Sequence, residues 1–386
     1  MDTRLNPAQA EVRERFAALF DDELTPSIRR MGEQPRTAEA EVEVEQLRQL
    51  VWQALVDLGA TRLLVPVERG GDAGGAAGGQ QSAVVLAELL GGALYQGPLL
   101  DTMTASEILA TDDALVARIV DGTPVALAGR QHGSDEPSNL PPMTLAADRL
   151  SAHRRFVSHA AQAEYLCVLG SQYDQPACAL VARTDPAVVL RRQQDSGRGE
   201  WYEVRLHEAS VLAAPADFAQ RWPALLAGAR LRQAGYLVGM CQAGLELAVH
   251  RVRDRRQFDQ PIGRFQAPAF ALAEAAARID GARLLVLAAA WQADQGADIR
   301  LPAAQALAMA ADLSRTVLSK AIHLHGAFGM TEQADSQLFY RRAAIERGWL
   351  GSPRALRAEV VPLLLAQRRA DRLPASGVSD AAGIAG

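Results

Sequence analysis

The sequence has 386 residues, of which 49% are hydrophobic and 22% are charged, a balance typical of soluble globular proteins. A chain of this length is too long for one small core, so two or three domains are expected. The formal net charge of -5 argues against a nucleic acid as a partner. The N-terminus is polar, no run of 18 apolar residues is present, and the cysteines lack metal-like spacing. We therefore expect a cytoplasmic protein without a membrane span or a metal site.

Apolar residues recur at helical spacing through the first part of the chain, which predicts an all-helical domain over residues 1–118. Its helical segments are residues 7–32, 37–59, 80–96 and 102–118. The glycine cluster at residues 70–79 lacks the lysine and the strand context of a phosphate-binding loop. It is interpreted as a loop between helices.

Short β-type runs separated by turn residues predict an antiparallel β domain or small barrel over residues 119–215. The runs lie at residues 124–128, 145–147, 165–169, 177–182 and 201–206. Helical spacing then returns and predicts a helical domain over residues 216–370. Its long segments are residues 222–256, 266–296, 302–327 and 334–347. The small, polar, glycine-rich stretch 371–386 is predicted to be a disordered tail.

The stretch from Arg255 to Gln266 reads RRQFDQPIGRFQ and lies between two of these helical segments. Pro261 and Gly263 break the helical pattern and predict a tight loop. Arginine groups, the Gln266 amide and the Phe258 ring suit recognition of a phosphate-bearing ligand. An ordinary helix–helix turn with a basic surface would carry the same residue types.

This stretch resembles the R-x-x-F-x-x-P-I-x-x-F-Q segment of the flavin-dependent acyl-CoA dehydrogenase family. Residues 321–331, followed by YRRA at 340–343, resemble a second family segment, Q-x-x-G-G-x-G, and the helix after it. The resemblance extends over about residues 5–370. It implies an α+β protein with the acyl-CoA dehydrogenase fold: an N-terminal all-α domain, a middle antiparallel β domain and a C-terminal four-helix bundle domain.

The resemblance also implies FAD as the cofactor and assigns residues to it. Arg255 and Gln266 would contact the pyrophosphate or adenine end, and Phe258 would pack on the cofactor. The segment Phe156-Val157-Ser158 resembles the family's W-I-T segment, which places the Ser158 hydroxyl near flavin N5. The other implied cofactor-binding residues are His323 and Gly326, in a part of the site that usually comes from a neighbouring subunit, and Ser352.

Residues 126–135 resemble the family segment A-L-T-E-P-x-A-G-S-D, of which the ending Gly133-Ser134-Asp135 is kept. The resemblance implies that Ser134 binds the acyl-CoA substrate. The loss of the T-E-P core leaves a plain polar loop as the alternative interpretation.

Family members remove the α-proton of an acyl-CoA thioester with a carboxylate, and here both family positions for that base hold other residues. Leu350 stands where one subgroup has glutamate, and Arg230 stands where another has it. Leucine cannot accept a proton, and arginine stays protonated. Glu346 lies nearby, although a solvated glutamate on a helix surface is its more ordinary interpretation. The catalytic base is left unassigned.

Further segments, among them residues 87–94 and Leu350-Gly351-Ser352-Pro353, resemble one branch of the family. Its members pair as non-identical subunits in α2β2 heterotetramers and act on bulky CoA esters, such as sterol-derived ones, in lipid metabolism. The resemblance implies a base-lacking subunit paired with a homologous acyl-CoA dehydrogenase subunit, with electron-transferring flavoprotein as the acceptor. The alternatives are a self-sufficient homotetrameric dehydrogenase with a relocated carboxylate, and a non-redox protein on the same fold.

Overall fold

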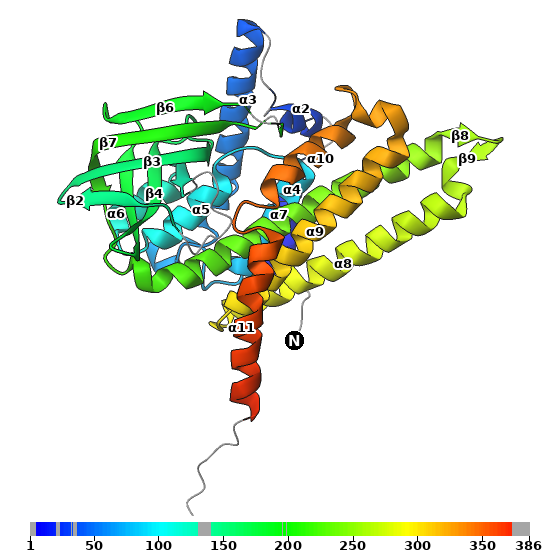
Figure 1. The fold of residues 1–386 in the computed structure, drawn as a ribbon. Coiled ribbons are helices and arrows are strands. Elements are labelled where there is room, and N and C mark those ends of the chain that lie inside the picture. The colour runs from blue at the N-terminus through cyan, green and yellow to red at the C-terminus, as the bar shows by residue number, and fades with distance from the viewer. Residues whose placement is uncertain are drawn as a thin grey trace, which may run out of the picture.

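The structure is a computed structural model that describes residues 5–20, 24–31, 33, 37–129, 140–194, 196–197 and 199–372. Helices from both ends of the chain flank a sheet formed by its middle part (Figure 1). This arrangement confirms the predicted α+β class with a helical first part, a β middle and a helical last part. Ser134 lies outside the described residues, as does the predicted tail from residue 373 onward; residues 371 and 372 end a helix.

The N-terminal helices form where the apolar pattern predicts them, but two of the expected helices are each divided. They are α1 (Pro7–Ala17), α2 (Thr25–Arg30), α3 (Ala38–Asp57), α4 (Gln80–Gly92), α5 (Leu99–Ile108) and α6 (Asp113–Val120). The single helix expected over residues 102–118 is wrong because the Asp112 side chain accepts from Leu115 N and starts α6 as a new helix. The helix expected over residues 7–32 is likewise two helices, and α2 begins with a proline in its first turn.

The middle part forms a sheet with strand order β1-β4-β5-β7-β3-β2, to which β6 adds by pairing with β7. The strands are β1 (Val125–Ala128), β2 (Met143–Ala146), β3 (Arg149–Ser158), β4 (Tyr165–Gln172), β5 (Gln175–Ala182), β6 (Val188–Gln193) and β7 (Trp201–Ala213). The expectation of a wholly antiparallel domain is wrong at one edge, where β1 runs parallel to β4. The chain enters β1 from α6 rather than through a hairpin, which allows this parallel pairing.

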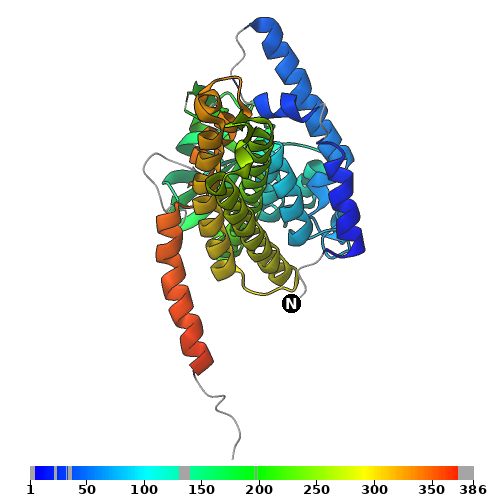
Figure 2. The ribbon, with the colours of Figure 1, turned by 90° about the vertical axis from the view of Figure 1, so that its right-hand side faces the viewer.

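The last part of the described chain is helical and is built around one long helix. Its helices are α7 (Phe218–Asp254), α8 (Gln266–Asp294), α9 (Arg300–His325), α10 (Asp335–Glu346) and α11 (Pro353–Arg372). α7 has 37 residues and runs from the sheet to the far end of the helical part, where the short strands β8 (Arg256–Gln257) and β9 (Gln260–Pro261) connect it to α8 (Figure 1). α8 and α9 lie beside α7 in both views (Figure 2). None of the helices in the described part of the chain has the length and apolar character that a membrane span requires.

The N-terminal and C-terminal helices share a hydrophobic core, and α4 packs directly on α7. Two glycines allow this close approach. A Cβ atom on Gly91 would lie 1.9 Å from the Tyr236 carbonyl oxygen, and one on Gly239 would lie 1.9 Å from the Glu88 carbonyl oxygen. The contact holds the middle of α7 against the N-terminal helices, so that its polar residues meet α5 and the sheet.

Candidate functional site

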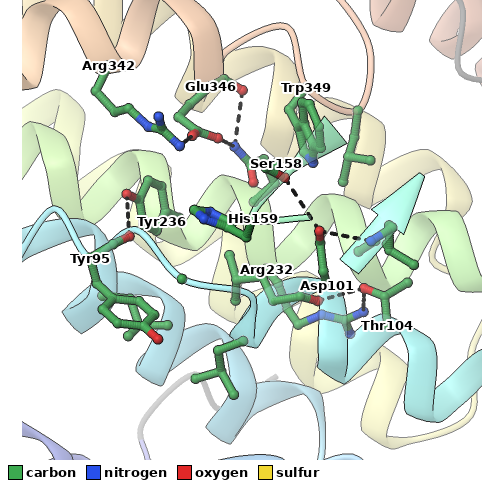
Figure 3. A pocket seen from close by; sticks show the side chains of 18 of the residues that line it. Tyr95, Asp101, Thr104, Ser158, His159, Arg232, Tyr236, Arg342, Glu346 and Trp349 are labelled. Carbon is green, nitrogen blue, oxygen red and sulfur yellow. Dashed lines mark hydrogen bonds and ion pairs between the residues drawn. The ribbon is translucent and has the colours of Figure 1, made fainter. Parts of the chain in front are cut away.

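A cavity lies where α5, α7, α10 and the end of β3 meet (Figure 3). Its wall carries several buried polar side chains: Asp101, Ser158, His159, Arg232, Arg342 and Glu346. The void has a volume of about 60 Å³, which is room for about four water molecules. Pockets for cofactors or drug-sized ligands are about 300–1,000 Å³. In this conformation the cavity is therefore too small for a flavin ring system.

Asp101, which the sequence analysis did not single out, is a buried carboxylate on this wall. Its Oδ2 atom accepts from Leu127 N at 3.1 Å and lies 3.5 Å from Ser158 Oγ. Burial raises the pKa of Asp101 to about 7, and the charge of Glu346 adds to the rise, while the Leu127 hydrogen bond opposes it. The local signal of Asp101 is an acidic residue in the first turn of α5, directly after the apolar residues Leu99 and Leu100.

Ser158 reaches the cavity through an irregularity in β3. The pairing of β3 with β7 shifts register between Arg154 and Val157, and Phe156, within this bulge, has a φ of 57°. Ser158 then pairs with Trp201 at the end of the ladder and is buried. Phe156 instead lies outside the described lining of the cavity, with its N–H bonded to Gln193 Oε1 at 3.1 Å. The structure thus brings only the hydroxyl of this motif to the cavity.

Glu346 is buried, so the interpretation as a solvated helix-surface glutamate is wrong. Its Oε1 atom lies 2.7 Å from Arg342 Nη2, and Gln233 Nε2 donates to its Oε2 atom at 2.9 Å. The Arg342 guanidinium stacks on the Trp201 ring at 5.1 Å, and the ring centroids of Trp201 and Trp349 are 5.2 Å apart. These contacts close the side of the cavity opposite Asp101 (Figure 3).

Arg230 and Leu350, which the sequence resemblance predicts to be the two base positions, meet in space although 120 residues separate them. Arg230 is buried, and its Nε atom donates to the Leu350 carbonyl oxygen at 3.1 Å. Its Nη1 and Nη2 atoms donate to the two carboxylate oxygens of Glu359 at 2.8 and 2.7 Å. Leu350 lines the cavity. Neither position offers a group that can accept a proton.

Most of the other predicted cofactor residues lie at the far end of the helical part, away from the cavity (Figure 1). Arg255, Phe258 and Gln266 are exposed at the α7–α8 connection, where Phe258 is 87% exposed. His323 and Gly326 are exposed at the end of α9. The rise of an α-helix puts Arg255 about 33 Å along α7 from Gln233 of the cavity.

The α7–α8 connection and the end of α9 lie close together. The Arg251 guanidinium near the end of α7 lies over the ring of Phe328, which follows α9, at 5.7 Å from the ring centroid. The exposed residues of these two segments are accessible to solvent in the isolated chain. Ser352 belongs to neither place: its Oγ atom accepts from Ala355 N at 3.2 Å and caps the start of α11. Within the described residues, no cluster of histidine, cysteine, aspartate and glutamate is arranged to hold a metal ion.

Comparison with known sequences finds a similarity in the helical last part of the chain. Residues 223–361 match the family model described as acyl-CoA dehydrogenase, C-terminal domain. The chain is 34% identical over 143 residues to the probable acyl-CoA dehydrogenase YngJ of Bacillus subtilis, a match that covers 37% of this chain and 38% of that protein. It is 29% identical over 333 residues to the acyl-CoA dehydrogenase FadE27 of Mycobacterium tuberculosis, covering 76% of this chain and 83% of that protein.

Solved structures extend the likeness to the whole fold. A variant of the Tcur3481–Tcur3483 steroid ACAD superposes with a TM-score of 0.82 at 22% identity, covering 95% of this chain and 100% of that one. A chain of the ChsE4–ChsE5 complex from Mycobacterium tuberculosis does so with a TM-score of 0.77 at 24% identity, covering 97% and 100%. The helical last part of the chain is thus similar to the C-terminal domain of acyl-CoA dehydrogenases, and the solved structures show that this chain has the acyl-CoA dehydrogenase fold.

Proposed function

We propose that this chain is a subunit of a FAD-dependent acyl-CoA dehydrogenase that lacks its own catalytic base. It pairs with a homologous subunit in an α2β2 heterotetramer that desaturates a bulky acyl-CoA, such as a sterol-derived one, and passes electrons to electron-transferring flavoprotein. When bound, FAD accepts the β-hydrogen of the acyl group as hydride, after or while a carboxylate removes the α-proton. In this proposal the partner subunit supplies that carboxylate.

The observation that carries the proposal is the contact between Arg230 and Leu350. Two alternative positions for one base must reach the same reacting atom, so their convergence in space supports the residue-by-residue resemblance. Both positions are occupied by side chains that cannot accept a proton, and Arg230 is in addition paired with Glu359. With this pair in place, the proposal assigns proton abstraction to another chain.

The predicted cofactor residues lie in two separate places, which supports the proposal that the cofactor is bound across the interface between two subunits. The exposed residues Arg255, Phe258 and Gln266 would contact the phosphate and adenine end of a FAD whose ring lies in the partner. The small, charged cavity of this chain offers no room for a bulky acyl group, which would lie in the partner's cavity as well. The likeness to chains of the Tcur3481–Tcur3483 protein and the ChsE4–ChsE5 complex supports pairing with a second, different chain.

The visible absorption spectrum tests the proposal directly. The chain is purified alone and after co-expression with a candidate partner, a homologous acyl-CoA dehydrogenase subunit that carries the catalytic glutamate. We expect a colourless, inactive protein alone, and a yellow complex that oxidises acyl-CoA when the partner is present. A yellow protein alone that is bleached by an acyl-CoA would contradict the proposal.

The far-end residues are tested in the complex by substitution. Arg255→Ala should raise the Kd of the complex for FAD at least about tenfold, as expected for the loss of a phosphate contact worth about 1.5–3 kcal/mol, and so lower the FAD content of the purified complex. Arg300→Ala is the matched control, because Arg300 is an exposed arginine paired with Asp298 at the opposite end of α9. Equal FAD contents in the two variants would exclude a cofactor role for Arg255.

A second candidate, a self-sufficient dehydrogenase with a relocated carboxylate, is favoured by one observation. Asp101 is a buried carboxylate 3.5 Å from Ser158 Oγ, the hydroxyl expected near flavin N5, and its pKa is raised to about 7. A base with a pKa near the working pH is suited to proton abstraction. If this candidate holds, the chain alone is active and Asp101→Asn abolishes that activity; an inactive chain alone excludes it.

A further inference from the structure

The wall of the cavity that belongs to the sheet presents two hydrogen-bond donors, the N–H of Leu127 at the end of β1 and the hydroxyl of Ser158 at the end of β3. Both face Oδ2 of Asp101 (Figure 3). An oxidised flavin ring carries two carbonyl oxygens and the nitrogens N1 and N5 as hydrogen-bond acceptors, and its N3–H is a donor. A ring that entered this cavity beside the sheet would need the same donors that Asp101 already occupies.

Asp101 is held in this place by two elements at once. The next residue of α5, Thr102, accepts from Val125 N at 3.0 Å and donates to the Val125 carbonyl oxygen at 3.2 Å. Consecutive residues of α5 therefore bind alternate residues of β1, and the four residues concerned are buried. Rotation of the Asp101 side chain would break its own contacts with Leu127 N and Ser158 Oγ, while Thr102 keeps α5 in place against β1.

The opposite side of the cavity is lined by Trp349 and Leu350, which lie in the connection between α10 and α11, residues 347–352, rather than in a helix or strand. This connection is held by the contact of Trp349 with Trp201 and by the bond from Arg230 to the Leu350 carbonyl oxygen. Connections of this kind shift more easily than residues inside packed elements. Entry of a ring would require this connection to shift and Trp349 to move away from Trp201.

We propose that Asp101 determines cofactor occupancy in this chain: its carboxylate takes the Leu127 and Ser158 donors and keeps a flavin ring out of the cavity. This inference rests on the proposed function, in which the chain serves a flavin held by its partner. It extends the proposed function by naming Asp101 as the residue that makes this chain's own cavity unfit for a second flavin. Shortening Asp101 frees both donors and removes the group that occupies the space in front of them.

The test measures FAD bound per copy of this chain in the co-expressed complex, from the absorbance of flavin released by denaturation. Asp101→Ala should raise this ratio by up to one FAD per copy of this chain. Asp101→Asn is the matched control, since the amide oxygen keeps the size and both acceptor contacts of the carboxylate, and its ratio should equal that of the parent. Asp101→Ser is a second test variant, because its side chain is also too short to fill the space of the carboxylate, and its FAD ratio should rise as well.

The inference about Asp101 is overturned if the alanine and serine variants form the complex but bind no more FAD than the parent. It is also overturned if Asp101→Asn gains FAD, because the negative charge rather than the occupied donors would then exclude the ring. Failure of the proposed function gives a different result: the parent chain alone would be yellow. Addition of lumiflavin, the ring without its tail, should quench tryptophan fluorescence more in Asp101→Ala than in the parent, because Trp201 and Trp349 line the cavity.

Discussion

Charged side chains that face one another, rather than solvent, form the wall of the cavity. Arg232 lies 2.7 Å from Glu107, and Arg342 lies 2.7 Å from Glu346, with both arginines buried. Removing one partner of such a pair leaves an uncompensated buried charge, which costs more than the pair contributes. Asp101 differs from these groups because its nearest hydrogen-bond partners, Leu127 N and Ser158 Oγ, are neutral.

Asp101 should make the stability of the protein depend on pH. Its pKa is raised by burial from 3.8 to about 7, so the folded state binds the proton more tightly than the unfolded state. Stability from this group is therefore greatest below pH 4 and falls as the pH rises to about 7. Asp101→Asn removes this dependence, and its gain in unfolding free energy over the parent should grow by about 2 kcal/mol between pH 5.5 and pH 8.

Urea unfolding followed by circular dichroism at the two pH values measures this difference. A constant offset between parent and variant would show that Asp101 titrates in the folded protein as it does in water. Such a result would contradict the buried, weakly compensated carboxylate that the structure shows.

At the scale of elements, the packing of α4 on α7 depends on which of two adjacent glycines faces the other helix. Gly91→Ala would place its Cβ atom 1.9 Å from the Tyr236 carbonyl oxygen, a collision with backbone that forces the helices apart. We expect a loss of about 3 kcal/mol or more in unfolding free energy. Thermal unfolding of the variant and the parent measures it.

Gly92→Ala is the control, because a Cβ atom there would meet Gly239 O at 3.9 Å, an ordinary contact. Alanine is the better helix former by up to about 1 kcal/mol, so this variant should be as stable as the parent or more stable. Similar destabilisation by both substitutions would mean that α4 presents a different face to α7.

A second contact between elements joins the end of α8 to the start of α4. The Asp294 carboxylate accepts from Gln80 N at 2.6 Å and from Gln81 N at 2.9 Å, which satisfies free N–H groups at the helix start. Asp294→Ala should lower the unfolding free energy by about 1–2 kcal/mol. Asp280→Ala on the same helix removes only an exposed ion pair with Arg283 and should change it by less than about 0.5 kcal/mol. Urea unfolding that shows equal losses would rule out the capping role.

Two strands, β3 and β6, were not predicted because their residues do not alternate regularly between apolar and polar. β3 and β6 read RLSAHRRFVS and VVLRRQ, with arginines that interrupt the alternation of apolar and polar residues. β3 also contains a bulge, which shifts the alternation by one residue. The more apolar strands β1, β4 and β5 were found, because their burial on the sheet requires continuous apolar residues.

At the scale of the whole molecule, the length of α7 separates the two groups of residues predicted to bind the cofactor. The cavity lies beside the sheet, and the exposed residues Arg255, Phe258 and Gln266 lie at the other end of the helix (Figure 1). A single cofactor extending between Ser158 and these residues would need a second chain. The exposed Phe258 ring, at 87%, leaves apolar surface uncovered in the isolated chain.

Hydrogen–deuterium exchange measures whether a partner covers this far end. On formation of the FAD-containing complex, peptides over residues 255–266 and 323–330 should exchange at least about tenfold more slowly, since ordering of exposed backbone by about 1.4 kcal/mol has that effect. A peptide over residues 84–92 is the internal control, because α4 is already buried against α7. Unchanged exchange at residues 255–266 would place the partner elsewhere.

The sequence by itself determined most of the long helices, the order of the helical and β parts, and the break in helical pattern at Pro261 and Gly263, because these depend on periodicity and backbone preferences within short stretches. It also showed that Leu350 and Arg230 cannot serve as bases. Only the tertiary structure decided that these two residues touch, that Glu346 is buried, and that Asp101 faces Ser158. Contacts between residues far apart in the chain arise from the packing of α5, α7, α10 and the sheet, which no local pattern records.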